Sequence, residues 1–153
     1  MTFSEIKAVF NLADNICADQ RELLEAVQTA ILGGSAETAD YDYLVVRDDY
    51  ILQAVSDSIS SDTYVLGCFN ASFIANSTDW PQVLVEAAQK GGAYTEIGEA
   101  IVEGGFVDAL AEAYISADGA GHCLSSYDGE EHELRFASES HDGEFVNLSV
   151  FRR

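Results

Sequence analysis

Charge sets this chain of 153 residues apart: 27 aspartates and glutamates stand against 7 lysines and arginines, a formal net charge of -20 at pH 7. A surface of this sign disfavours direct binding to nucleic acid or to an anionic membrane, and it attracts cationic protein surfaces. Because 48% of the residues are hydrophobic and 10% aromatic, the composition excludes a disordered acidic tail. The length predicts one domain, residues 1–153, around one core.

Cysteine usage and the termini bear on the compartment. The three cysteines are too few, and odd in number, for a disulfide framework, so we expect reduced and mostly buried thiols. The N-terminus has no basic leader followed by an apolar core, and no apolar run approaches the length of a membrane span. These features predict a soluble, cytoplasmic protein.

The N-terminal part of the chain, residues 1–117, reads mainly as helices. Apolar residues recur at helical spacing in residues 5–14, after Ser4, and in residues 20–34, after Asp19. Two glycines end the second of these helices. Residues 41–46 are short, aromatic and β-branched, which indicates a strand.

Further helices follow this strand, and each begins at a capping acid or ends at glycine. Asp48 or Asp49 is expected to cap residues 50–60, and Ser61 or Asp62 to cap residues 63–76. Asp79 precedes Trp80 and Pro81 at a position that suits a cap before an early-helix proline. The remaining expected helices are residues 80–90, 94–103 and 106–117.

The C-terminal part, residues 120–153, reads as strands. It is punctuated by three Asp-Gly dipeptides, which favour tight hairpin turns; they begin at Asp118, Asp128 and Asp142. The segments after these dipeptides can alternate in period two, and they are residues 121–127, 130–137 and 144–153. The sequence therefore predicts an α+β fold, helix-rich in its N-terminal two-thirds with a C-terminal antiparallel β-hairpin or meander.

A possible metal or catalytic site lies near the second dipeptide, where His122, Cys123 and His132 come close in sequence. In a hairpin closed by Asp128-Gly129, strand alternation puts the two histidines on opposite faces. With His141 added, the spacings still match no common zinc pattern. A Cys123 and His132 catalytic pair lacks an orienting third group and an oxyanion motif. We expect no metal, no cofactor and no enzymatic activity, and keep both sites as minor alternatives.

The acids have few local partners: from Asp48 to Leu134 there are sixteen acids and one base, Lys90. Glutamates at i, i+3 and i+7 in residues 96–103 predict an acidic helical stripe, although like charges at such spacing cost a few tenths of a kcal/mol per pair. Twenty charges correspond to about 34 Å of duplex DNA. The candidate contact residues for a basic partner are Glu96, Glu99, Glu103, Asp108, Glu112, Asp128, Glu130, Glu131 and Glu133.

In size, acidity and lack of catalytic motifs the chain resembles the small acidic counter-defence proteins of phages and plasmids, of the DNA-mimicking antirestriction and anti-CRISPR type. Its C-terminal residues 142–153, "DGEFVNLSVFRR", are similar to the tail of some ArdA-type antirestriction proteins. The resemblance implies a protein inhibitor that occludes the basic nucleic-acid-binding groove of a nuclease or a CRISPR or restriction component. It also implies action in the host cytoplasm; the oligomeric state stays open, with a dimer as one option.

Two other interpretations remain. The chain contains only two lysines, and its many aspartates and alanines also suit a halophile's cytosolic protein, whose acidic surface keeps the fold soluble. Alternatively, a small-ligand or enzymatic pocket lies around Trp80, Tyr94 and Tyr114, although such aromatic residues more often belong to a core.

Overall fold

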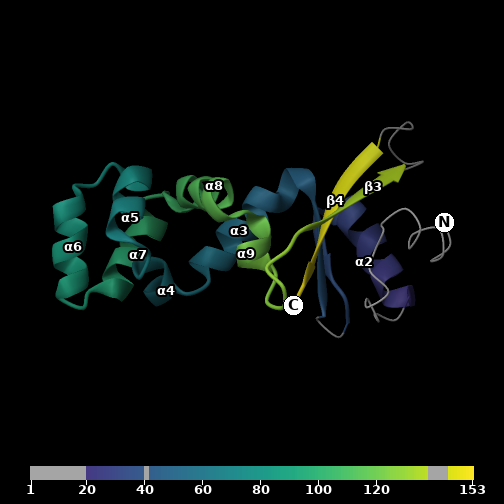
Figure 1. The fold of residues 1–153 in the computed structure, drawn as a ribbon, viewed down its shortest axis with the longest axis horizontal. Helices are drawn as coiled ribbons and strands as arrows, with labels where there is room; N and C mark the ends of the chain where they lie inside the picture. Colours follow the sequence, from purple (N-terminus) through teal and green to yellow (C-terminus); the bar gives the residue numbers. More distant parts are fainter. Residues whose placement is uncertain (1–19, 40–41, 138–144) are drawn as a thin grey trace. The chain divides into compact units, whose positions relative to one another are not determined.

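The computed structural model describes residues 20–39, 42–137 and 145–153, which form two compact units (Figure 1). Unit 1 combines Met1–Ile51 with Ala120–Arg153, and unit 2 is Leu52–Gly119. The helix expected over residues 5–14, the expected cap Asp19 and the turn at Asp142 lie outside the described residues.

Unit 1 contains a four-stranded antiparallel sheet of order β1-β2-β4-β3 (Figure 1). Its strands are β1 (Ser35–Glu37), β2 (Tyr43–Arg47), β3 (His132–Ala137) and β4 (Phe145–Arg152). The strands expected in residues 41–46, 130–137 and 144–153 are confirmed, and so is the α+β class. Central strand β4 pairs with β2 and with β3, so the two ends of the sequence meet in one sheet.

The core of unit 1 lies between the sheet and α2 (Gln20–Gly33). Leu23, Val27 and Ile31 recur at i, i+4 and i+8 on one face of the helix, as the sequence predicts, and are buried. They pack against inward-facing strand residues that include Val45 and Leu148. This burial removes large apolar side chains from water and fixes the register of the strands.

The strand expected over residues 121–127 is wrong, because this segment begins with a helix, α9 (Ala120–Leu124). Ala120 and Leu124 lie four residues apart and are both buried, and α9 contacts β4. Gly121 lets the helix approach the following backbone: a Cβ there would lie 2.5 Å from the carbonyl oxygen of Gly129. Burial of a helical face against the sheet therefore overrides the weak alternation in the sequence.

Unit 2 consists of short helices. After the 3-10 turn η1 (Asp48–Tyr50), which belongs to unit 1, α3 (Ile51–Ser60) leads into the unit. The remaining helices are α4 (Thr63–Gly67), α5 (Ala71–Thr78), α6 (Gln82–Lys90), α7 (Tyr94–Glu103) and α8 (Val107–Asp118). The helices expected over residues 50–60, 80–90, 94–103 and 106–117 are thus confirmed to within a few residues.

The expected caps have mixed outcomes. Asp62 caps α4 as predicted, with its carboxylate accepting from the backbone N–H groups of Tyr64 and Val65. Asp79 is not a cap at a helix start: it follows α5 in the left-handed region, with φ of 58°. Neither Asp48 nor Asp49 caps the next helix, because Arg47 occupies the cap position of η1 and both acids lie in its first turn.

The single helix expected over residues 63–76 is wrong, since it breaks into α4 and α5 around Cys68. Asn70 caps the second piece, accepting a hydrogen bond from the backbone N–H of Ser72. A cap in the middle of an apolar run lets the chain turn between two buried faces, with Leu66 on one helix and Ile74 on the other.

Candidate acidic binding surface

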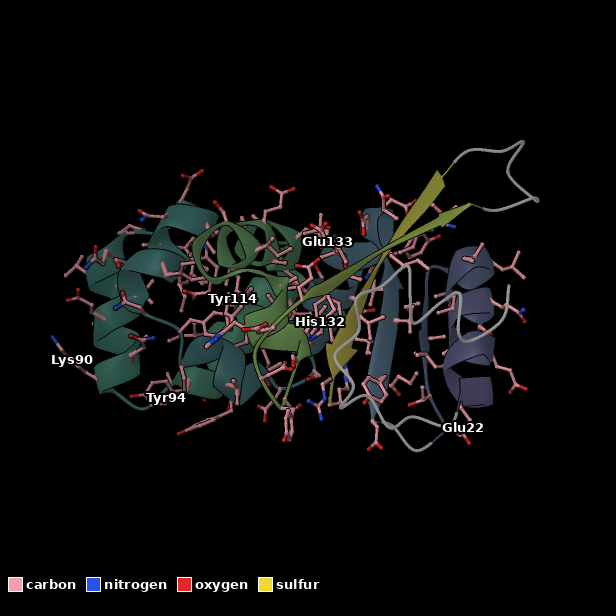
Figure 2. All side chains as sticks on the ribbon, turned by 45° about the vertical axis from the view of Figure 1, so that its right-hand side comes forward. Glu22, Lys90, Tyr94, Tyr114, His132 and Glu133 are labelled. Carbon is pink, nitrogen blue, oxygen red and sulfur yellow. The ribbon has the colours of Figure 1, made fainter. Side chains whose placement is uncertain are left out.

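Unit 2 carries ten acids and one base, Lys90, which gives it a formal net charge of -9. None of the ten acids forms an ion pair with any residue in the described part of the chain. Figure 2 shows Lys90 extending from the end of α6. Glu86 is half-buried, and the nine exposed acids are Asp57, Asp62, Asp79, Glu96, Glu99, Glu103, Asp108, Glu112 and Asp118. Nine of the ten acids of unit 2 therefore face solvent, and none of them is paired with a described lysine or arginine.

The predicted stripe on α7 forms as expected within its own helix. Glu96, Glu99 and Glu103 are exposed, whereas Ile97 and Ile101 on the other side of the helix are buried. None of the three glutamates forms an ion pair with a residue in the described part of the chain. Amphipathic burial of α7 fixes which of its sides is acidic.

The two predicted acids of α8 differ in their surroundings. Asp108 accepts a hydrogen bond of 2.7 Å from the hydroxyl of Ser56 on α3, so part of its acceptor capacity is used within the unit. Glu112, one turn later on the helix, is exposed. Asp108 therefore has a structural role as well as a place on the acidic surface.

The four remaining predicted acids belong to unit 1, and they do not form a hairpin tip. They lie in the segment between α9 and β3 and at the start of β3. Asp128 accepts from the Ser125 hydroxyl at 2.7 Å and from the backbone N–H of Glu130 at 3.1 Å. These hydrogen bonds, the one from Ser125 first, hold the pKa of Asp128 below its usual value. Asp128 thus stabilises a turn in which Gly129 has φ of 72°.

A cluster of carboxylates, which the sequence pattern does not predict, surrounds Ser149. The Ser149 side chain is fully buried in central strand β4, and its hydroxyl lies 2.6 Å from Glu131 and 3.4 Å from Asp48. Glu133 pairs with Ser149 in the strand register. Burial raises the pKa of Asp48, and the charges of Glu131 and Glu133 raise it further, while the Ser149 hydroxyl opposes the shift. Only strand pairing brings together acids more than 80 residues apart in sequence.

A Ser, Asp and His grouping in unit 1 has the wrong connectivity for nucleophilic catalysis. Asp128 stands in the middle: Ser125 donates to one of its oxygens, and His132 Nε2 lies 3.6 Å from the other. A catalytic triad instead needs histidine between the nucleophile and the acid. Ser125 also lies 2.8 Å from the carbonyl of Arg152, where β4 ends. The grouping therefore ties the turn to the sheet.

His122 and Cys123 lie on α9, and His132 lies on β3, so the expected hairpin faces do not exist. Within the described ranges, no group of three or more His, Cys, Asp or Glu side chains is arranged to hold a metal ion. His141 lies outside those ranges. Cys123 is half-buried, whereas Cys68 is exposed, against the expectation of mostly buried thiols.

An apolar groove of about 370 Å³ lies between α6 and α7 of unit 2. Trp80, Leu84 and Ala88 line it from one side, and Ile97 and Ala100 from the other, with Glu96 as its one charged lining residue. Leu84 is 62% exposed. The sequence carries one signal for this groove. Apolar residues recur at helical spacing at positions 81, 84, 85 and 88, and all four of them line the groove.

The aromatic residues suggested for a pocket do not converge. Trp80 lines the groove and meets the ring of Phe106 edge-on. Tyr94 contacts the ring of Tyr64, and Tyr114 stacks on Phe69. Of the three, Trp80 alone borders the groove.

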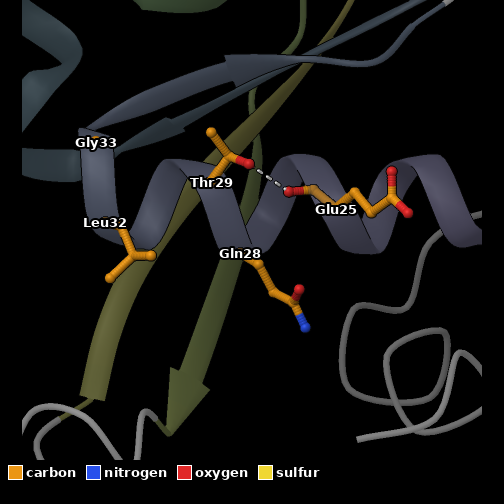
Figure 3. A pocket seen from close by; sticks show the side chains of 5 residues that line it. All are labelled: Glu25, Gln28, Thr29, Leu32 and Gly33. Atoms are coloured by element: carbon orange, nitrogen blue, oxygen red, sulfur yellow. Dashed lines mark hydrogen bonds between the residues drawn. The ribbon is translucent and has the colours of Figure 1, made fainter.

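A second hollow, of about 590 Å³, lies on the solvent side of α2 (Figure 3). All five of its described lining residues come from this one helix, and they include Glu25, Thr29 and Leu32. The Thr29 hydroxyl donates to the backbone carbonyl of Glu25 at 2.7 Å. The described lining residues therefore come from one face of one helix, and no second described element brings groups toward them.

Comparison with known proteins adds no information on function. No protein-family model, curated protein or solved structure matches this chain. In the part of the chain that the structure describes, every helix is too short or too polar to cross a membrane.

Proposed function

We propose that this protein is an inhibitor that binds, through the acids of unit 2, a basic surface on which another protein holds nucleic acid. The observation that carries the proposal is the solvent-facing charge of unit 2, which has nine exposed acids and one base, and none of these acids is ion-paired with a described residue. An ordinary solvated surface mixes both signs. A binding surface for a cationic groove gains from charges that have no partner in the free protein, because no internal pair must be broken.

The spacing along α7 supports mimicry of a phosphate backbone. Glu96 and Glu103 are seven residues apart, about 10.5 Å along the helix axis at 1.5 Å per residue. Three carboxylates fall within this length, and one strand of duplex DNA carries about three phosphates over the same distance. Buried Ile97 and Ile101 hold the α7 helix in place, so binding of a partner orders the glutamate side chains but does not have to order the backbone that carries them.

The resemblance in type to phage and plasmid counter-defence proteins favours a nuclease, or a CRISPR or restriction component, as the partner. The contact residues that we assign to unit 2 are Glu96, Glu99, Glu103 and Glu112, with Asp108 contributing through its free oxygen. Glu130 is the exposed acid of the α9–β3 segment with the least local engagement, whereas Asp128 and Glu131 accept hydrogen bonds from serines.

The test is a pull-down with the immobilised protein from a bacterial lysate at low salt, with duplex DNA as competitor. We expect nucleic-acid-binding enzymes to be retained, to be released by the DNA, and to elute steeply with added salt. A variant with Glu96→Gln, Glu99→Gln and Glu103→Gln should retain about tenfold less of them. Asp118→Asn, which changes one exposed acid away from the stripe, is the control. Retention that DNA does not reverse would contradict the proposal.

The halophile interpretation makes a different prediction for the same protein. If the acids serve only solubility in brine, the fold needs molar salt, and its circular dichroism spectrum will become that of an unfolded chain at about 0.1 M NaCl. We expect the spectrum to remain helical at that concentration. Unfolding on removal of salt would favour the solubilising role over the inhibitor.

A further inference from the structure

The groove between α6 and α7 borders the acidic stripe directly. Glu96 lines the groove, and Glu99 and Glu103 follow it at i+3 and i+7 on the adjoining side of α7. The opposite wall is apolar, with Leu84 62% exposed and Trp80 beside it. The groove therefore combines an apolar lining with carboxylates along one edge, and it lies beside the acidic residues that we propose as the binding surface.

We infer that this groove takes a basic amphipathic segment of the partner protein. Apolar side chains of the segment enter the channel between Leu84 and Ile97, and its lysines or arginines face Glu96, Glu99 and Glu103. The inference rests on the proposed function and names the chemistry of the partner. Helices that dock in grooves present apolar anchors at i, i+3, i+4 and i+7, which matches a channel that runs between two helices.

Charge complementarity selects this occupant over a second copy of the same chain. A copy would bring a net charge of -20 to a unit that already carries -9, and like charges that face each other oppose association. A basic segment instead neutralises the stripe while it covers Leu84. Burial of apolar area and pairing of the exposed carboxylates then act together, and neither requires a group of unit 2 to give up an internal ion pair.

The experiment measures binding of three fluorescein-labelled peptides of about 14 residues, four helical turns, to the full chain at low salt. The first carries leucines on one helical face and lysines elsewhere. The second has the same composition in scrambled order, and the third has glutamine in place of lysine. We expect the first peptide to bind about tenfold more tightly than either of the others.

Matched variants locate the site. Leu84→Ser removes an exposed apolar wall of the groove, and its neighbour Val83, 68% exposed and outside the groove, gives the control Val83→Ser. Because both side chains are exposed, both variants are expected to fold. Ala88→Phe fills the groove, and Ala87→Phe on the exposed side of the same helix is its control. Leu84→Ser and Ala88→Phe should each abolish the preference for the amphipathic peptide, while the controls keep it.

The outcomes separate the inference from the proposed function. In one outcome the two lysine peptides bind equally, and both lose affinity for the triple glutamine variant of the stripe. This result overturns the inference about the groove but supports the acidic surface as a binding site. Binding that is indifferent to that triple variant overturns the acidic surface as well. If the glutamine peptide binds as tightly as the amphipathic lysine peptide, the groove binds apolar side chains regardless of the charge of the segment, and the inference is overturned. A concentration-dependent dimer in sedimentation that Ala88→Phe abolishes would assign the groove to a second copy.

Discussion

Asp48 and Asp49 are neighbours in the sequence, yet the pKa values of their carboxyl groups move in opposite directions. The Arg47 guanidinium, at 2.5 Å from Nε to Oδ1, holds the pKa of Asp49 below its ordinary value. Burial beside Glu131 and Glu133 raises the pKa of Asp48. Arg47, the last residue of β2, also donates to the carbonyl of Ile31 near the end of α2. This hydrogen bond links the helix end to the strand, and the ion pair with Asp49 holds the guanidinium in place. The contrast is set by what each side chain faces.

These shifts predict opposite effects for two neighbouring substitutions. Asp49 stabilises the fold at pH values above its ordinary pKa of 3.8, and this stability is lost as the pH falls through its lowered pKa in the folded state. Ionised Asp48 instead destabilises the fold, and this cost disappears as the pH falls through its raised pKa. At pH 7 we expect Asp48→Asn to raise the melting temperature by about 1–2 °C and Asp49→Asn to lower it by a similar amount.

Thermal melts followed by circular dichroism from pH 7 down to pH 4 check both variants. The gain from Asp48→Asn should shrink as the pH falls, because the folded wild-type protein takes up a proton on Asp48 as the pH passes through the raised pKa of this group. Glu131 still accepts from Ser149 in this variant, so the buried hydroxyl keeps its closer partner. A gain that is independent of pH would assign the effect to packing and not to charge.

At the scale of elements, α4 and α7 cross at two glycines. A Cβ on Gly67 would meet the backbone carbonyl of Tyr94, and a Cβ on Gly98 would meet that of Thr63, both at distances that real atoms do not adopt. Each helix thus offers a glycine to the start of the other. This close crossing fixes α7, and with it the acidic stripe, against the rest of unit 2.

We expect Gly98→Ala to destabilise the protein by about 1–3 kcal/mol, because backbone must move to admit the methyl group. Gly33→Ala is the control: the space around Gly33, the last residue of α2, is open and its φ is not positive. That change should cost nothing, since alanine favours a helix over glycine. Urea titrations followed by circular dichroism measure both. Equal midpoints for Gly98→Ala and the wild type would show that the crossing is looser than the structure has it.

The element that the sequence misassigned is also instructive. Residues 121–127 show weak alternation and end at an Asp-Gly dipeptide, which favours a hairpin strand. The structure instead buries Ala120 and Leu124 as one face of α9. Residues 121–127 do not encode the surface that α9 covers, because that surface is β4, a strand that begins more than 20 positions after the end of α9 in the chain.

For the whole molecule, the length predicts a single domain, whereas contacts divide the described chain into two compact units. The single-domain prediction has a direct test. The one tryptophan, Trp80, reports on unit 2 alone, and Leu148 is a fully buried residue of unit 1. If the chain unfolds as one domain, Leu148→Ala lowers the urea midpoint seen by Trp80 fluorescence, through a loss of about 2–5 kcal/mol.

The control is Leu32→Ala, at a side chain that is 78% exposed, which should leave the midpoint within error. Circular dichroism on the same samples follows both units together. Coincident transitions by the two probes are expected for one domain. A fluorescence midpoint that ignores Leu148→Ala while the circular dichroism signal falls in two steps would show two independently folding units.

The sequence by itself determined the α+β class, most helix boundaries in residues 50–117, three strands and the acidic stripe of α7. Local periodicity and glycine placement carry that information, because they act within one or two turns of chain. Only the tertiary structure decided that β2 and β4 are neighbours, that Glu131 and Asp48 meet at Ser149, and that Leu84 and Ile97 wall a groove. These contacts depend on which distant segments pack against one another. The hydrophobic effect that drives the packing is non-directional, so the sequence pattern of one segment does not specify its partner.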